Sequence, residues 1–306
     1  MSTWYTRYVN TPGETVNVRK GPGKTYDVVT TLGHATKVEV DQPNSTWSQV
    51  RRPNEDVLGY VMTEFLVEED PYVNIPSSSF IVGHFGKTNT TQVKVRKSPS
   101  TSAGHYNNVV KGSTFLIEGV VNGTAIDGIT TWVKIRYGTA SGGSKNAYIH
   151  SKYFTDIGAA PSSAKARCIT IAKSLDKNTE ANLGLGGECC QMFIYWLCGA
   201  CGIQVDEMPY GTNTCGPARN YFRDTHGEWH SITENYTPQP GDLVYYGETN
   251  GTTSNHVGFV VVGGNNYQSI ECNLSDKIKL CTGNVADEYC ETNGKHIQGF
   301  ATPTWD

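Results

Sequence analysis

A histidine, a carboxylate and an amide are brought together by a predicted β-hairpin. Residues 256–273 read as two strands around a central Gly-Gly-Asn-Asn segment, which is a strong hairpin turn signal. With the middle Gly-Asn as the two-residue loop, His256 lies opposite Asn273, and Glu271 lies two residues along on the same face. An imidazole held by a carboxylate and an amide can act as the general base of a nucleophilic site, with the carboxylate and amide fixing its orientation.

The nucleophile that this base would serve is a cysteine at a predicted helix start. Residues 189–202 are apolar on almost every side, which is typical of a helix buried in a domain core, and Cys189 and Cys190 stand at its beginning. Unpaired backbone N–H groups and the positive end of the helix dipole favour the thiolate, the form that attacks. The backbone N–H of the nucleophile is also a natural donor to an oxyanion. From these features alone the two cysteines compete for the role.

Metal-binding patterns in this part of the chain are weaker. Cys198 and Cys201 form a Cys-x-x-Cys pair, but it lies inside the predicted helix and lacks a second pair of ligands. Asp176, Asn178 and Glu180 lie in the loop before the helix, and three such residues are more often solvated than bound to calcium. We therefore expect no metal ion and no cofactor.

The composition excludes two classes of partner. The chain has 306 residues and a net charge of −4, with 16 Lys/Arg against 13 Asp/Glu in residues 1–157 and 9 against 16 in residues 158–306. Neither part carries a basic stripe that would suggest nucleic acid. No stretch approaches the roughly 20 apolar residues of a membrane span. Abundant Gly, Thr, Asn, Ser and Tyr with few charges favour a β-rich protein that works outside a cell.

Export and redox state are left open by the sequence. The N-terminus shows no apolar signal region, so either a leader has been removed or export uses none. Of the nine cysteines, one is reserved as the nucleophile, and the other eight are either paired or reduced.

The elements that position the site fall into three predicted regions. Residues 1–70 and 78–156 form an internal repeat of short strands with Gly, Pro and Asn turns, which predicts two small all-β barrels. A linker with two prolines, residues 70–79, separates the copies. Residues 160–306 place helices first and antiparallel strands afterwards, which predicts an α+β catalytic domain.

The two repeats resemble the bacterial SH3 domain. The first copy has Val-Asn-Val-Arg-Lys-Gly-Pro from Val16, followed by a Leu-Gly turn, a Trp-Ser-Gln-Val strand and Gly-Tyr-Val. The second keeps Val-Arg-Lys-Ser-Pro and Trp-Val-Lys-Ile and carries an insertion around residues 138–146. The resemblance implies two SH3-like barrels that attach the protein to cell-wall peptidoglycan. A spacer barrel without a ligand is the alternative.

The last region resembles the CHAP and NlpC/P60 cysteine peptidases. Four motifs occur in the family order: the helix Cys-Gln-Met-Phe-Ile-Tyr-Trp, then Pro-Gln-Pro-Gly-Asp-Leu-Val, Asn-His-Val-Gly-Phe-Val, and Ser-Ile-Glu-Cys-Asn. Gly202 and Ile203 lie in the family register when counted from Cys190, which selects it over Cys189. Glu-x-Asn in the last motif, in place of a histidine, favours the CHAP type. The resemblance implies a papain-like fold.

Site roles follow from this resemblance position by position. Cys190 is the nucleophile, His256 is the base, Asn273 orients the histidine, and Glu271 supports or polarises it. One position departs from the pattern, because many CHAP domains carry Gln directly before the cysteine, where its amide lines the oxyanion hole. This chain has Cys189 there, which leaves the second oxyanion donor unassigned.

The expected function is that of a peptidoglycan hydrolase that cleaves an amide bond through a thioester acyl-enzyme. Two SH3-like modules ahead of the catalytic domain favour an endopeptidase, and an N-acetylmuramoyl-L-alanine amidase is the alternative. A non-catalytic wall-binding protein with a decayed hydrolase domain is the alternative of another class, and acyl transfer is a further one. The expected partner is bacterial cell-wall peptidoglycan, with no nucleic acid and no membrane. The expected place of action is extracellular or in the cell wall, for a wall-remodelling enzyme or for a phage lysin released by lysis.

Overall fold

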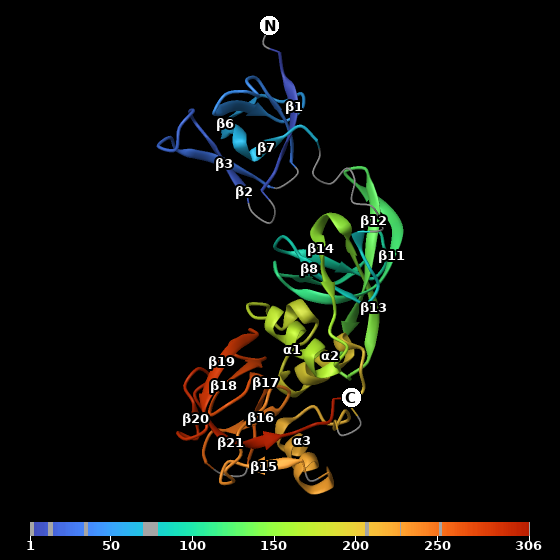
Figure 1. The fold of residues 1–306 in the computed structure, drawn as a ribbon, viewed down its shortest axis with the longest axis vertical. Helices are drawn as coiled ribbons and strands as arrows, with labels where there is room; N and C mark the ends of the chain where they lie inside the picture. The colour runs from blue at the N-terminus through green and yellow to red at the C-terminus, as the bar shows by residue number, and fades with distance from the viewer. Residues whose placement is uncertain are drawn as a thin grey trace.

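Three antiparallel sheets and three α-helices form the described part of the computed structural model. The structure describes residues 3–11, 15–33, 36–69, 79–205, 208–226, 228–250 and 253–305, so almost all of the expected linker at 70–79 lies outside it. The sheets follow one another along the chain, with the helices beside the second and third sheets (Figure 1). No helix in the described ranges is both long enough and apolar enough to cross a membrane.

The first two sheets have the same strand order, which is the structural form of the sequence repeat. The first is ordered β3-β2-β6-β5-β4-β1-β7 and the second β10-β9-β13-β12-β11-β8-β14. Each strand of the first thus corresponds to the strand seven places later in the second. The first sheet consists of β1 (Tyr5–Val9), β2 (Thr15–Arg19), β3 (Val28–Gly33), β4 (Lys37–Val40), β5 (Trp47–Arg51), β6 (Val57–Met62) and β7 (Leu66–Val67). The second consists of β8 (His84–Thr88), β9 (Val93–Arg96), β10 (His105–Val109), β11 (Thr114–Ile126), β12 (Ile129–Gly138), β13 (Ser144–His150) and β14 (Phe154–Ala159).

Alternation along β2 and β9 explains why these repeat motifs fold as strands. Val16 and Val18 in the first copy, and Val93 and Val95 in the second, are buried on one face while their neighbours point away from the core. The glycine of the first Gly-Tyr-Val motif allows close approach of two strands. A Cβ on Gly59 would lie 2.4 Å from the carbonyl oxygen of Arg19, and its φ of 148° also favours glycine.

The C-terminal part places its helices before its sheet. The helices are α1 (Ala164–Ser174), α2 (Cys190–Cys201) and α3 (Cys215–Tyr221). The sheet is ordered β15-β21-β16-β17-β18-β19-β20, with β20 also pairing with β21. Its strands are β15 (Trp229–Ser231), β16 (Leu243–Gly247), β17 (His256–Val262), β18 (Asn266–Glu271), β19 (Lys279–Asn284), β20 (Tyr289–Cys290) and β21 (Lys295–Ala301).

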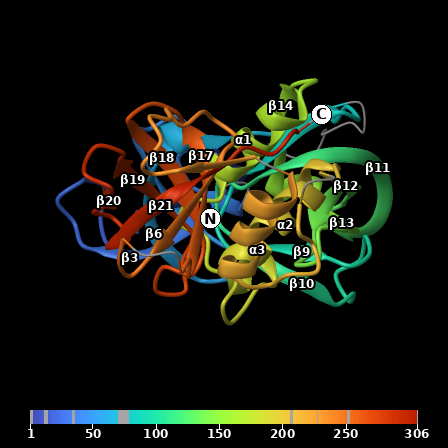
Figure 2. The ribbon, with the colours of Figure 1, turned by 90° about the horizontal axis from the view of Figure 1, so that it is seen from below.

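Helix α2 is the central element of this part. All of its residues except Met192 are buried, as the apolar run in the sequence requires. It ends at Gly202, which adopts the left-handed conformation with a φ of 72° and whose backbone N–H donates to the carbonyl oxygens of Cys198 and Gly199. Figure 2 shows α2 between the strands of the third sheet and strands β12 and β13 of the second. The nucleophile candidate therefore lies at the start of a helix that is held on two sides.

The second sheet shares a hydrophobic core with the helices of the C-terminal part, the third sheet has a further cluster, and the first sheet has its own core. The ring of Tyr137 packs edge-on against Trp196 of α2, with centroids 5.3 Å apart. The turn after β12 lies directly on the helix backbone, because a Cβ on Gly138 would lie 1.9 Å from the carbonyl oxygen of Trp196. The insertion noted in the second repeat thus packs against helix α2.

Candidate active site

The hairpin that carries the histidine pairs in the predicted register at its open end. Gly258 pairs with Glu271 and Val260 with Ser269, as expected with the middle Gly-Asn as the loop. Nearer the turn the register shifts by one residue, so that Val262 pairs with Gln268. This irregularity lies away from the site and is a β-bulge of the kind that adds one residue to a strand. The predicted register is therefore confirmed from Gly258–Glu271 to Val260–Ser269 and wrong at the turn, and the expected pairing of His256 with Asn273 does not form because strand β18 ends at Glu271.

Cys190, His256 and Glu271 form a continuous chain of hydrogen bonds. Nδ1 of His256 lies 3.1 Å from Sγ of Cys190, and Nε2 lies 2.9 Å from Oε2 of Glu271. The side chains are almost fully buried, with residue exposures of 4%, 2% and 0% in chain order. The cysteine comes from the first position of α2 and the other two from neighbouring strands β17 and β18. One imidazole thus joins a helix N-terminus to the sheet.

The carboxylate of Glu271 is fixed by three further donors. Its Oε1 accepts from the hydroxyls of Ser269 at 2.6 Å and Tyr246 at 2.7 Å. Its Oε2 also accepts from Nδ2 of Asn293 at 2.8 Å. These partners were not found from the sequence. Ser269 could have been found, because it lies two residues before Glu271 and therefore on the same face of the strand. Nothing in the local pattern marks Asn293, which lies between β20 and β21.

The pKa shifts at the site favour a charged chain. A hydrogen bond with Cys215 and the bond with His256 lower the pKa of Cys190 to about 4, against the opposing effect of burial. Burial acts to lower the pKa of His256, but its bonds to Cys190 and Glu271 raise it to about 10. Burial acts to raise the pKa of Glu271, but His256 and the hydroxyl and amide donors hold it below its usual range. The directions of these shifts favour an imidazolium at His256 between a thiolate at Cys190 and a carboxylate at Glu271.

Asn273 lies on the sulfur side of the histidine. Its side-chain amide hydrogen-bonds with Cys190, which helps to lower the pKa of that thiol. Strand β18 ends at Glu271, and Asn273 has a left-handed φ of 68°, a conformation that asparagine tolerates better than most residues. The structure thus brings all four predicted site residues together. Among the described side-chain bonds of His256, the partner opposite the sulfur is Glu271.

The side chains on either side of Cys190 have partners other than His256. Sγ of Cys189 lies 2.9 Å from Sγ of Cys272, so Cys189 is not the cysteine at His256. Gln191 is fully buried, and its Oε1 accepts from the hydroxyl of Tyr245 at 3.0 Å. The first backbone N–H groups of a helix have no intrahelical partner, so the one at Cys190 is available as a donor.

The loop before α2 differs from the expectation of a solvated acidic segment. Asn178 is fully buried, where its amide bonds the hydroxyl of Ser113 at 3.1 Å, and Glu180 is 5% exposed. Burial raises the pKa of Glu180. Asp176 accepts from the backbone N–H of Leu280 at 3.1 Å. The expectation of solvation is wrong for Asn178 and Glu180, because this loop is packed between the second sheet and the C-terminal part.

A groove of about 470 Å³ runs between the second sheet and the helix side of the site. Its lining includes Met192, two residues after Cys190, and Gly184 from the loop before it. From the second sheet come Tyr106 and two lysines, Lys97 and Lys145, whose ammonium groups lie 5.4 and 5.5 Å from the centroid of that ring. The groove thus combines an aromatic face with positive charge.

Comparison with known proteins gives one family and a set of solved structures. The CHAP domain family matches residues 179–273. Among solved structures, NlpC2 from Trichomonas vaginalis is 15% identical with a TM-score of 0.32, and the alignment covers 99% of each chain. NlpC1 from the same organism is 15% identical with a TM-score of 0.31, covering 99% of this chain and 94% of that one. An NlpC/P60 endopeptidase from Photobacterium damselae subsp. piscicida is 13% identical with a TM-score of 0.26, covering 97% of this chain and 66% of that one.

No curated protein matches the chain. The matched segment begins one residue before Glu180 and ends at Asn273. It therefore includes the helix start, the histidine strand and the carboxylate. The part of this chain that holds Cys190, His256 and Glu271 is similar to the CHAP domain.

Proposed function

We propose that this protein is a cysteine hydrolase that cleaves an amide bond in bacterial cell-wall peptidoglycan. The observation that carries the proposal is the hydrogen-bonded chain from Cys190 through His256 to Glu271 at the start of a buried helix. The match of residues 179–273 to the CHAP domain supports the same class of chemistry.

The proposed reaction has two halves, formation of a thioester and its hydrolysis, and Cys190 and His256 act in both. The Cys190 thiolate attacks the carbonyl carbon of the amide, and the oxyanion that forms is stabilised by the backbone N–H at the helix start. The His256 imidazolium then gives its proton to the leaving amine, and a thioester remains. Water, deprotonated by the now neutral imidazole, attacks the thioester and releases the carboxylic acid. Glu271 holds the imidazole in position and stabilises its charged form.

We infer an endopeptidase rather than an amidase from the groove beside the helix. Lys97 and Lys145 supply positive charge next to the aromatic face of Tyr106. Stem peptides of the wall carry carboxylates, whereas the glycan chain offers mainly hydroxyl groups. A cationic groove leading from Met192 suits a substrate that extends from the site as a peptide.

The two N-terminal sheets are proposed as SH3-like wall-binding modules. Their identical strand order and their repeated motifs support a common origin of the two copies. The second sheet shares its core with the catalytic part, so it would position substrate directly, and the first would add attachment. The proposed place of action is outside the cell or in the cell wall.

Digestion of purified peptidoglycan tests the proposal. We expect the wild-type protein to release fragments whose masses show one hydrolysed peptide bond, and Cys190→Ala to reduce the rate by roughly 10⁴-fold or more. Cys201→Ser, at the other end of the same helix, is the matched control and should retain activity. Equal lysis by Cys190→Ala would refute the nucleophile. Fragments cleaved between muramic acid and alanine would establish the amidase instead, and wall binding without any product would indicate a decayed hydrolase.

A further inference from the structure

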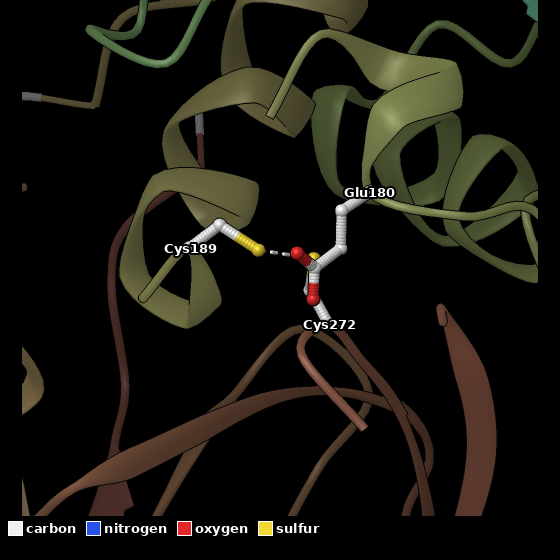
Figure 3. A group of neighbouring side chains, drawn as sticks. All are labelled: Glu180, Cys189 and Cys272. Carbon is white, nitrogen blue, oxygen red and sulfur yellow. Dashed lines mark hydrogen bonds between the residues drawn. The ribbon is translucent and has the colours of Figure 1, made fainter. Parts of the chain in front are cut away.

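Three buried side chains converge beside the active site without being part of it. Glu180, Cys189 and Cys272 each offer one donor atom, and these atoms lie within 4.8 Å of one another (Figure 3). The two cysteines are fully buried and Glu180 is 5% exposed. Sγ of Cys189 lies 2.9 Å from Sγ of Cys272, and the carboxylate of Glu180 lies beside both sulfurs. The three residues come from three separate segments of the chain.

One oxygen of this carboxylate has no partner. Oε1 of Glu180 is buried and accepts no hydrogen bond from any described group. A buried carboxyl oxygen without a partner is unfavourable unless the group is neutralised or a cation compensates it. A disulfide between Cys189 and Cys272 would use the two sulfurs and still leave this oxygen unsatisfied. A bound cation accounts for all three side chains.

We propose that Glu180, Cys189 and Cys272 bind one zinc ion. Two thiolates select a borderline-soft metal such as zinc and disfavour calcium and magnesium, which prefer oxygen ligands. Zinc prefers four donors: the two sulfurs and one oxygen of Glu180 supply three, and the second oxygen of the same carboxylate would complete the set. Binding releases the two thiol protons to solvent and requires no oxidant. The site is closed on all sides by burial, which is typical of a structural metal.

The ion would hold together the segments that carry the catalytic groups. Cys189 is the residue directly before Cys190, at the N-cap of α2, and Cys272 directly follows Glu271 at the end of β18. Glu180 lies in the loop that precedes the helix. A metal bound here fixes the start of the helix to the end of the strand. The proposal concerns this cross-link alone and does not depend on which substrate the protein cleaves.

Cobalt binding to the full chain tests the site directly. Protein prepared under reducing, metal-free conditions with a non-coordinating phosphine should bind one equivalent of Co²⁺. The complex should show the sulfur-to-cobalt charge-transfer band and the intense visible bands of a tetrahedral ion, and one equivalent of Zn²⁺ should displace it. Metal analysis of protein prepared with zinc present should give one zinc per chain.

Three variants locate the bound ion. Cys272→Ser should abolish the charge-transfer band or shift it strongly. Glu180→Gln, which keeps the size of the side chain, should weaken zinc binding by about tenfold or more, since loss of even an outer partner of a metal costs that much. Cys201→Ser, an equally buried cysteine at the far end of α2, should bind as the wild type does. Because the wild-type titration and Glu180→Gln suffice on their own, misfolding of Cys272→Ser would not decide the result.

Two results would overturn the proposal. One is a wild-type chain that binds no stoichiometric cobalt or zinc under these conditions. The other is a peptide map of protein purified without reductant in which Cys189 and Cys272 are joined as a disulfide. Loss of binding in Cys201→Ser together with retention in Cys272→Ser would likewise place the metal elsewhere.

Discussion

Oε2 of Glu271 lies 2.9 Å from Nε2 of His256, on the side of the ring opposite the cysteine. Both side chains are buried, and the carboxylate accepts three further hydrogen bonds, from Ser269, Tyr246 and Asn293. A charge this well satisfied has one strongly preferred position. Glu271 therefore sets the orientation of the imidazole, and Asn273 acts on the sulfur side of the ring.

Replacement of this carboxylate by its amide tests the orienting role. Glu271→Gln keeps the volume but removes the charge that stabilises the imidazolium, and it can present an N–H where Nε2 also carries a proton. We expect kcat for peptidoglycan cleavage to fall by about 10³- to 10⁴-fold, with little change in KM. Steady-state kinetics on soluble wall fragments measure both constants.

The control for this variant removes only one donor to the carboxylate. Asn293→Ala leaves the charge of Glu271 in place with its two hydroxyl partners, so kcat should fall by about tenfold at most. An activity loss in Asn293→Ala as large as that in Glu271→Gln would mean that the position of the carboxylate matters rather than its charge. Retained kcat in Glu271→Gln would contradict the orienting role altogether.

Asn273 should contribute less to kcat than Glu271 does, because its amide stabilises only the thiolate of Cys190. Its backbone is left-handed, so alanine would add strain, whereas glycine keeps the conformation and removes only the amide. Loss of one hydrogen bond to a charged sulfur is worth about 1.5–3 kcal/mol, so Asn273→Gly should lower kcat by about 10- to 100-fold. The rate of Cys190 alkylation by iodoacetamide should change in the same variant. An alkylation rate equal to that of the wild type would place the amide away from the sulfur.

The sequence predicts the parts of this site that depend on regular periods. A period of two along β17 and β18 places His256 and Glu271 near each other, and the apolar run after Cys190 predicts a buried helix. The structure places the start of that helix against His256. The register slips at the turn because a bulge adds a residue between Val260 and Val262, and no residue type announces it.

The remaining features depend on contacts between segments that are far apart in the chain. Asn293 reaches Glu271 from the β20–β21 connection, and Glu180 meets Cys189 and Cys272 from a loop that reads as solvated. The common core of the second sheet and α2 likewise arises from packing of Tyr137 on Trp196. Composition and local period carry no information on such pairings, because each segment taken alone satisfies its own pattern.

Asp156 should stabilise the second sheet in a pH-dependent way. Burial acts to raise the pKa of its carboxyl, but hydrogen bonds from the backbone N–H groups of Ile81 and Gly158 and from His84 hold the pKa below its usual value. A depressed carboxyl pKa gives stability that is present above the unfolded-state pKa, near 4, and is lost as the pH falls through the folded-state pKa.

Asp156→Asn measures this contribution. The amide would turn one N–H group toward a backbone N–H donor, so the variant should be less stable by about 1.5–3 kcal/mol at pH 7, measured by urea unfolding. The difference from the wild type should shrink as the pH falls below about 4. A difference that stays constant from pH 7 to pH 3 would mean that the charge of Asp156 is not what stabilises the sheet.

Gly199→Ala should weaken the contact between the second sheet and helix α2. Alanine normally favours a helix over glycine by about 1 kcal/mol, so the intrinsic effect would be stabilising. Here an added Cβ would lie 2.0 Å from the carbonyl oxygen of Gly143, which is backbone and cannot rotate away. We expect a net destabilisation of about 1–3 kcal/mol in urea unfolding, with lower peptidoglycan activity because the groove is formed across this contact.

Gly211→Ala is the matched control, since its Cβ would meet nothing within 4 Å, and it should change stability by less than about 0.5 kcal/mol. Stabilisation by Gly199→Ala would show that the turn after β12 moves freely with respect to α2.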